Sequence, residues 1–555
     1  MSDRHRAPRP APPAPHPARA GESARFEGFL DRTFERRLSD QPILAATQGI
    51  PDGEGRLPRA TRAAETRRLR ENKEALRQLD TFSPRELSPD QHLDRLALRA
   101  LLRREVEDHQ RGRAGLEPSA VETLLNILLH ELQRGVRAPD RAAGNLRSLL
   151  AAAPRFLSES ASLLGQPEPA WLRIAQQTAA GAGSMLAAVE RFLANTALPG
   201  DPRRDARLVS GAGRAIGAYQ RHAENLSPAP PGSYALGADR LQRRVTDELG
   251  LDLTLGEIES LAHAEIARLG GLLEQACRRL GRGTAGEILA AARTAWEPGE
   301  DLPALYRRET GRVARGFREA GVVAFPAAES LEITPVPEFL RHLFPTAAYS
   351  SPGAFETSQR GVFWVNDLGA TLADPARRRA ERQQHFGIGL TCAHEAYPGH
   401  HLQFVTANRH PRRWRRLFAH AVFYEGWTLW CEHLMGELQL DPGPGFAVQQ
   451  LHDALWRAHR ILVDLRLQTG RYPYREATRH LEQHLHFTRA RAEADVNWYL
   501  GAPGVPMSYW LGRLENERLH QRLVAGRGWS PRQFHDWLLA HGTLPQAWLE
   551  RYLLD

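Results

Sequence analysis

Apolar side chains recur every three to four residues along most of the chain, with charged residues between them. The pattern is clear in residues 89–110, where Leu93, Leu96, Leu98 and Leu101 lie on one stripe. Such a stripe is typical of an amphipathic helix that buries one face. By the same criterion we predict helices from residue 26, over 59–79, 121–134, 140–164, 169–196, 201–226, 235–249, 254–280, 375–408, 412–438, 445–469, 474–489 and 493–500, and from 508 to the end.

Two short stretches, residues 331–336 and 361–366, are instead rich in β-branched and aromatic residues. This composition is typical of strands, so we expect a mainly α protein with a small β-sheet. Prolines and a glycine near residue 230 interrupt the helical pattern. We therefore predict an N-terminal helical lobe, residues 26–230, and a second lobe, residues 231–555, which carries the candidate chemistry. Residues 1–25, rich in Pro, Ala and Arg, are predicted to be a disordered tail.

The net charge of +8 does not indicate nucleic-acid binding, because the arginines alternate with acidic residues along the predicted helices. No apolar run reaches the length of about 18 residues that a membrane span needs. The N-terminus lacks the apolar segment of a secretory signal. The three cysteines have no paired spacing and fit a reducing compartment. We expect a cytoplasmic protein with no nucleic-acid or membrane partner, and the sequence makes no prediction of its oligomeric state.

Residues 394–401, His-Glu-Ala-Tyr-Pro-Gly-His-His, contain the densest group of metal-binding side chains. Two histidines four positions apart on a helix share one face and can bind one zinc ion, with an intervening glutamate as general base. Here His394 and His400 are six positions apart and would point to different faces of a regular helix. The proline and glycine before His400 predict a break that turns the two rings together. We favour His400 as the second ligand, although a different local winding would present His401.

A catalytic zinc ion takes three protein ligands and keeps one position open for water. Glu425 is our candidate for the third ligand, because it lies between Tyr424 and a glycine in an apolar helical stretch, where a carboxylate needs a partner. The glycine lets another backbone approach closely. Glu432 lies two helical turns further along the same face and is expected to orient one of the ligating imidazoles.

These motifs resemble a known family, the bacterial domain-of-unknown-function 885 family. The resemblance is carried by the HEAYPGHH stretch, by Tyr-Glu-Gly-Trp at 424–427, by the strand at 361–366 and by residues 495–512, and it covers about residues 26–555. It implies a large helical zincin-like fold with the small β-sheet beside the metal-site helix, and the chemistry of gluzincin-type zinc peptidases. Where the family pattern has Arg, Gln and Lys, this chain has Trp498, Val505 and Trp510, which indicates a specialised substrate.

The resulting hypothesis is a hydrolase that holds one zinc ion per chain and cleaves a small peptide or amide substrate. Glu395 would take a proton from the metal-activated water and pass it to the leaving amine. Tyr509 is the first candidate to stabilise the oxyanion, and Tyr424 and His401 are alternatives. Residues 361–366 either pair with an extended peptide substrate or form an ordinary internal strand.

Two other functions fit the same residues. Two histidines and a carboxylate also bind non-haem iron, so a non-hydrolytic biosynthetic enzyme that uses iron or another divalent metal is one alternative. The other is a catalytically silent peptide-binding homologue, for which the altered C-terminal motif is the indication. The presence of Glu395 beside the first histidine, together with all three candidate ligands, favours hydrolysis.

Overall fold

The structure is a computed structural model. It describes residues 20–554 except 197–199, 282, 300, 337–345, 368, 370, 371, 442 and 444. The described chain is mainly helical with one small β-sheet, as the sequence predicts. Among the described residues, no helix combines the length and the apolar character that crossing a membrane requires.

The first part of the chain forms nine helices among its described residues: α1 (Ala20–Asp40), α2 (Pro42–Thr47), α3 (Arg62–Asp80), α4 (Pro89–Gln110), α5 (Arg113–Leu116), α6 (Ala120–Gly135), α7 (Pro139–Ala161), α8 (Pro169–Ala194) and α9 (Pro202–Asn225). The predicted end of the disordered tail at residue 25 is wrong, because α1 begins at Ala20. Ser23 and Arg25 explain the difference. Ser23 accepts a hydrogen bond from Gln91 at 2.7 Å, and Arg25 stacks over Phe82 at 4.6 Å. Residues 1–19 of that tail lie outside the described residues.

The later helices are α10 (Ala238–Asp247), α11 (Leu255–Leu280), α12 (Ala285–Ala295), α13 (Leu302–Ala320), α14 (Pro375–Arg382), α15 (Ile388–Glu395), α16 (His400–Ala407), α17 (Ala421–Glu437), α18 (Phe446–Gln468), α19 (Tyr474–Leu485), α20 (Arg489–Gly501), α21 (Val505–His520), α22 (Pro531–Ala540) and α23 (Gln546–Leu553). The helical stretch predicted over 375–408 is divided at two places. The break before His400 lies where the Pro-Gly pair predicts it, whereas the interruption at Gly387, which has a positive φ, was not predicted. The helix predicted from residue 412 begins only at Ala421, after a short 3-10 turn.

The sheet contains β1 (Ser330–Pro335), β2 (Ala347–Ser350) and β3 (Arg360–Val365) in the order β1-β3-β2. β1 is parallel to β3, and β2 is antiparallel to it. The two predicted strands are confirmed within one residue, whereas β2 was too short to be recognised by its pattern. Because β3 has a neighbour on each side, it cannot pair with a peptide substrate, and the internal-strand alternative is confirmed.

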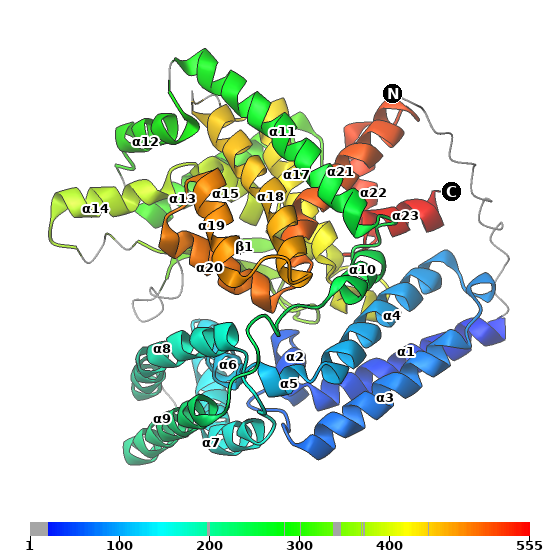
Figure 1. The fold of residues 1–555 in the computed structure, drawn as a ribbon, viewed down its shortest axis with the longest axis vertical. Coiled ribbons are helices and arrows are strands. Elements are labelled where there is room, and N and C mark those ends of the chain that lie inside the picture. Colours follow the sequence, from blue (N-terminus) through cyan, green and yellow to red (C-terminus); the bar gives the residue numbers. More distant parts are fainter. Residues whose placement is uncertain are drawn as a thin grey trace.

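Buried apolar side chains form three clusters. The first joins Phe26 and Leu93 of the N-terminal helices to Phe317, Cys392 and Trp427 around the candidate site. The second packs α11, α18, α20 and α21 together, and the third packs α6 to α9 against β3. Figure 1 shows α1 to α9 on one side of the molecule and α11 to α23 on the other. The first cluster crosses residue 230, so a division into two lobes there stays a prediction.

Candidate metal centre

The histidine-rich stretch is broken between its first and second candidate ligands. α15 ends at Glu395 and α16 begins at His400, and the Tyr397–Pro398 peptide between them is cis. A Cβ atom on Gly399 would lie 1.8 Å from the carbonyl oxygen of His394, so the turn accepts only glycine there. The predicted break at the Pro-Gly pair is therefore confirmed.

The break brings three candidate ligand atoms to one point. Oε2 of Glu425 lies 3.7 Å from Nε2 of His394 and 3.5 Å from Nε2 of His400. The two rings are nearly perpendicular, at 86°, with centroids 4.9 Å apart. Ligand atoms about 2.1 Å from one tetrahedral ion would be about 3.4 Å apart, so these separations fit a shared ion. Among the described residues, this is the one group of three His, Cys, Asp or Glu side chains close enough to hold a metal.

The remaining atoms of these side chains are unequally satisfied. Nδ1 of His394 donates to Oε1 of Glu432 at 2.7 Å, which turns its Nε2 toward the centre. Nδ1 of His400 and Oε2 of Glu425 are buried and have no hydrogen-bond partner among the described residues. Burial alone would raise the pKa of Glu425, but His400 and His394 hold it below its ordinary value. The centre is thus a buried carboxylate that faces two imidazoles without a complete set of partners, as a cation site would be.

The close contact of α17 with α21 places Tyr509 at this centre. A Cβ atom on Gly426 would lie 2.5 Å from the carbonyl carbon of Gly512, so the two helices meet backbone to backbone. The hydroxyl of Tyr509 lies beside the Glu425 carboxylate and helps to lower its pKa, and burial raises the pKa of Tyr509 well above its usual range. The ring of Tyr424 lies 5.9 Å from the ring of His400. Both tyrosines singled out in the sequence therefore lie beside the candidate ligands.

His401 lies in a different group of hydrogen bonds. Its Nε2 donates to Oε2 of Glu329 at 2.7 Å, and its Nδ1 accepts from the hydroxyl of Tyr349 at 3.0 Å. The hydroxyl of Tyr397 also donates to Glu329, at 2.7 Å. A Cβ atom on Gly361 would lie 2.5 Å from Nδ1 of His401, so the central strand approaches this ring closely. His401 ties α16 to β2, while His400 is the histidine that joins the group of three.

Glu395 is the carboxylate that remains available near the centre. It is partly exposed and directly follows His394, and it makes no hydrogen bond or ion pair with the residues that the structure describes. Burial alone would lower the pKa of His394, but the carboxylates of Glu432, Glu395 and Glu425 raise it. After burial and Tyr397, Glu395 also contributes to raising the pKa of Tyr349 well above its usual range. A free carboxylate therefore lies beside the candidate ligands.

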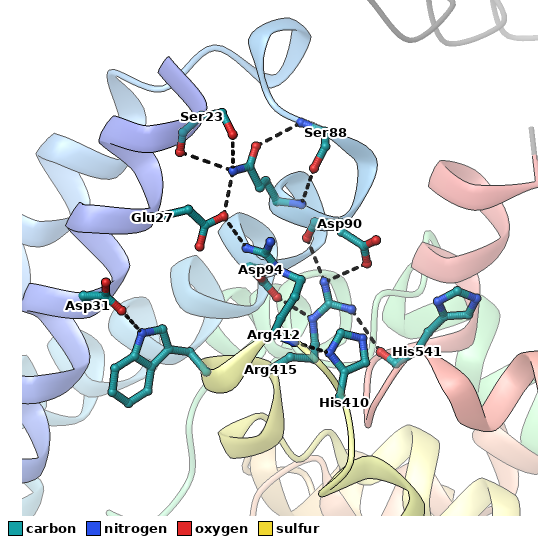
Figure 2. Close-up of polar contacts among 12 residues, drawn as sticks. Ser23, Glu27, Asp31, Ser88, Asp90, Asp94, His410, Arg412, Arg415 and His541 are labelled. Carbon is teal, nitrogen blue, oxygen red and sulfur yellow. Dashed lines mark hydrogen bonds and ion pairs between the residues drawn. The ribbon is translucent and has the colours of Figure 1, made fainter. Parts of the chain in front are cut away.

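A buried ionic network, which we call the Asp94–Arg415 network, holds the segment between α16 and α17 (Figure 2). Asp94 of α4 accepts hydrogen bonds from Nε of both Arg412 and Arg415. Arg412 also donates to Glu27 at 2.8 Å, and Arg415 donates to the carbonyl oxygen of His541 at 3.0 Å. This network joins the N-terminal helices to the chain just before the helix that carries Glu425.

Comparison with known proteins identifies the family. A family model described as "Bacterial protein of unknown function (DUF885)" matches residues 42–553. The chain belongs to this family. Its fold is similar to a "putative lipoprotein of unknown function" from Shewanella oneidensis, with a TM-score of 0.76, 16% identity, and coverage of 96% of this chain and 99% of that one. A "putative lipoprotein" from Colwellia psychrerythraea gives a TM-score of 0.74 at 16% identity, with coverage of 96% and 98%. No curated protein matches the sequence.

The three residues that the sequence analysis expects to depart from the family pattern lie in different surroundings. Trp510 is buried and donates to Glu265 at 3.0 Å, so it belongs to the core. Val505 begins α21. Trp498 is 39% exposed and meets the ring of Tyr509 edge to face, with centroids 6.0 Å apart. Of the three, Trp498 is the one that contacts the candidate site.

Sequence reasoning missed the partners of His401 and one buried arginine, Arg460. Glu329 precedes β1 in a stretch with no motif, and it meets His401 across 72 positions of the chain. Tyr349 lies on the unpredicted β2. Arg460 lies on a predicted helix among many arginines, and it is the arginine of that helix that is buried. A local pattern signals none of these contacts, because each depends on which helices pack together.

Proposed function

We propose that this DUF885 protein is a zinc-dependent hydrolase with a gluzincin-like site in a zincin-like fold, which cleaves a peptide or related amide bond. The observation that carries the proposal is the convergence of His394, His400 and Glu425, with Glu395 free beside them. Two imidazoles and a carboxylate are a donor set of catalytic zinc sites. A zinc ion held there would supply Lewis acidity and a bound water whose pKa is lowered to about 7.

Glu395 is the general base of this proposal. It is partly exposed, so that water and substrate can reach it, and its backbone is fixed by the adjacent ligand. It would take a proton from the water and then give a proton to the leaving nitrogen. Glu432 holds the Nδ1 proton of His394 and thereby keeps the other ring nitrogen free for the metal.

Tyr509 is our candidate for the donor to the oxyanion, because its hydroxyl already contacts the carboxylate of a candidate ligand. Tyr424 contacts His400 through its ring rather than through a hydrogen bond. His401 is occupied at both nitrogens by Glu329 and Tyr349. We therefore assign His401 to the positioning of α16 rather than to substrate contact.

Replacement of Glu395 by Gln tests the hydrolase. We expect the purified variant to keep one zinc ion per chain and to lose about 10²- to 10⁴-fold in turnover of peptide and acyl-amide substrates, the usual contribution of a general base. Glu437→Gln, which changes an exposed carboxylate on α17, should keep full activity. Turnover that survives in Glu395→Gln would show that the base is another group.

Metal analysis of the wild-type protein tests the donor set itself. We expect about one equivalent of zinc that a chelator removes and that His394→Ala fails to hold. Stoichiometric iron with oxygen-dependent turnover would instead support the non-hydrolytic alternative, because two histidines and one carboxylate also suit iron. Absence of any bound divalent metal at micromolar concentrations would remove the basis of both proposals.

A further inference from the structure

Arg460 of α18 is a buried cation next to the candidate metal centre. It is 6% exposed. Its guanidinium carbon lies 4.0 Å from the ring centroid of Trp456, 4.7 Å from that of Tyr509, 5.2 Å from that of Trp498 and 5.7 Å from that of Tyr499. Four aromatic rings thus surround the guanidinium, and rings of this kind attract a cation without neutralising its charge.

No carboxylate of the described residues forms an ion pair with Arg460. Its Nε donates to the hydroxyl of Tyr499 at 3.1 Å, and that hydroxyl in turn donates to Asp495 at 3.0 Å. The two terminal nitrogens donate to no described residue. A buried charge is costly unless it is paired and hydrogen-bonded. The two terminal nitrogens of Arg460, which form the fork of its guanidinium, are therefore the part of this cluster that still requires an anion.

A neighbour on the same helix shows the usual arrangement. The guanidinium carbon of Arg457 lies 3.9 Å from the centroid of Trp456, much as that of Arg460 does. Arg457, however, forms an ion pair with Asp453 at 4.0 Å. The two arginines share a helix and an aromatic partner and differ in the carboxylate, so Arg457 is a matched control for Arg460.

The position of Arg460 connects it to the metal centre. α17, α18 and α21 lie side by side (Figure 1). Tyr509 of α21 presents its ring to Arg460 and its hydroxyl to Glu425 of α17. On the other side, the 39% exposed Trp498 borders the same guanidinium and reaches solvent. One tyrosine therefore separates the unpaired fork from a candidate ligand, and an exposed indole forms the outer wall.

We propose that Arg460 is the anion-binding residue of a substrate subsite, where its guanidinium pairs with a carboxylate of the substrate and Trp498 packs against the substrate's apolar part. The inference rests on the proposed hydrolase and names its substrate class as carboxylate-bearing peptides or amides. A planar fork binds a carboxylate through two parallel hydrogen bonds, which a lysine in this place would not provide.

A binding experiment tests the subsite without turnover. The probes are benzylsuccinate and 3-phenylpropionate, which share a phenyl ring and one carboxylate and differ by a second carboxylate. Titration calorimetry on the zinc-loaded Glu395→Gln protein should show benzylsuccinate to bind about tenfold tighter or more, as hydrogen bonds to a charged group imply. Arg460→Met should abolish this preference, whereas Arg457→Met should keep it.

The outcomes separate the subsite from the hydrolase. Suppose that Arg460→Met keeps the wild-type melting temperature and still binds benzylsuccinate more tightly than 3-phenylpropionate, while zinc binding and Glu395-dependent hydrolysis are observed. The subsite proposal is then wrong, and the hydrolase proposal is supported. If the protein does not bind zinc, both the hydrolase proposal and the subsite proposal are wrong. If Arg460→Met does not fold, Arg460→Lys decides: it keeps the charge without the fork, so a partial loss of preference is expected and an unchanged preference overturns the proposal.

Substrates then locate the carboxylate. N-benzoyl dipeptides are compared as free acids, as C-terminal amides, and as C-terminal amides with glutamate as the last residue. A higher kcat/KM for the free acid alone would assign Arg460 to a terminal carboxylate, and equal rates for free acid and glutamate amide would assign it to any carboxylate at that reach. Equal rates for all three in the wild-type protein would contradict the subsite.

Discussion

Two of the buried polar clusters in the described chain take residues from the segment 394–425, and they differ in how completely their charges are paired. In the Asp94–Arg415 network, Arg415 is fully buried, and Asp94 accepts from two guanidinium groups (Figure 2). In the metal centre, Nδ1 of His400 and Oε2 of Glu425 have no hydrogen-bond partner among the described residues. In the first cluster the buried charged groups have partners within the network, and in the second two buried polar atoms have none.

This difference separates a network that needs no ligand from the cluster for which we propose one. Buried charges are tolerated when they are paired and hydrogen-bonded, so a closed network needs nothing further. A cluster in which a carboxylate oxygen faces two imidazole nitrogens at 3.5 and 3.7 Å has the donor set that the proposed zinc ion would take. The same criterion distinguishes Arg457, which forms an ion pair with Asp453, from Arg460, which forms no ion pair with a carboxylate among the described residues and meets Asp495 only through the hydroxyl of Tyr499.

Removing one charge of the closed network should have the largest effect on stability. Asp94→Ala removes the buried carboxylate that Arg412 and Arg415 share and leaves Arg415 with only the partly exposed carboxylate of Asp90 at 3.3 Å. We expect this to cost about 3 kcal/mol of the free energy of unfolding. Denaturant titration should show this loss equally in zinc and in chelator, because the network holds no metal. Asp31→Ala, which removes an exposed carboxylate bonded to Trp414 at 2.6 Å, should cost only about 1 kcal/mol.

A loss below about 1 kcal/mol in Asp94→Ala would contradict the view that Arg415 depends on Asp94 for its stability in the buried position. The double replacement Asp94→Leu with Arg415→Met tests whether the loss comes from an unpaired buried charge. Replacing both partners by apolar groups removes the unpaired charge, so we expect it to recover most of the lost stability. The closed cluster would then be a structural element with no ligand of its own.

Weakening the open cluster should change metal affinity more than stability. Glu432→Ala removes the partner of Nδ1 of His394, and partners of this kind contribute about 10- to 100-fold to metal affinity. Competition with a zinc chelator measures the change, and unfolding in the absence of metal should move less than it does for Asp94→Ala. Glu437→Ala, on the same helix and outside the centre, is the control. Unchanged zinc affinity in Glu432→Ala would limit Glu432 to packing.

The sequence was informative where chemistry is local. The helical stripes, the break before His400 and the carboxylate at Glu425 could each be predicted, because spacing, proline and glycine act within a few residues. The sequence favoured His400 over His401 as the second ligand but left the alternative open, since the contacts that engage His401 come from Glu329 and Tyr349, which approach it from the region of the sheet.

Long-range packing explains the other differences. Asp94 and Arg415 are 321 positions apart, and each lies in a stretch where charged residues are common. β3 has the pattern of any half-buried strand, and its central place follows from the order of the sheet. The four residues of β2 are too few for an alternating pattern to stand out. In each case the deciding contact joins segments whose pairing no local pattern specifies.

Acid should open the closed network, with the smallest effect of the three. Burial, and then Arg415, lowers the pKa of His410 from 6.5 to about 4, and its Nδ1 accepts from the backbone N–H of Arg412 at 3.2 Å. The unfolded chain therefore binds more protons between pH 6.5 and 4, so stability is lost as pH falls through this range. His410→Asn, which keeps a hydrogen-bond acceptor without a titrating ring, should reduce the loss between pH 6.5 and 5.5 by about 1 kcal/mol. Urea titrations at several pH values measure the difference. Identical slopes for variant and wild type would show that the network stays closed without a neutral His410, and the acid loss would then belong to other buried histidines such as His92, whose pKa is also lowered to about 4 by burial.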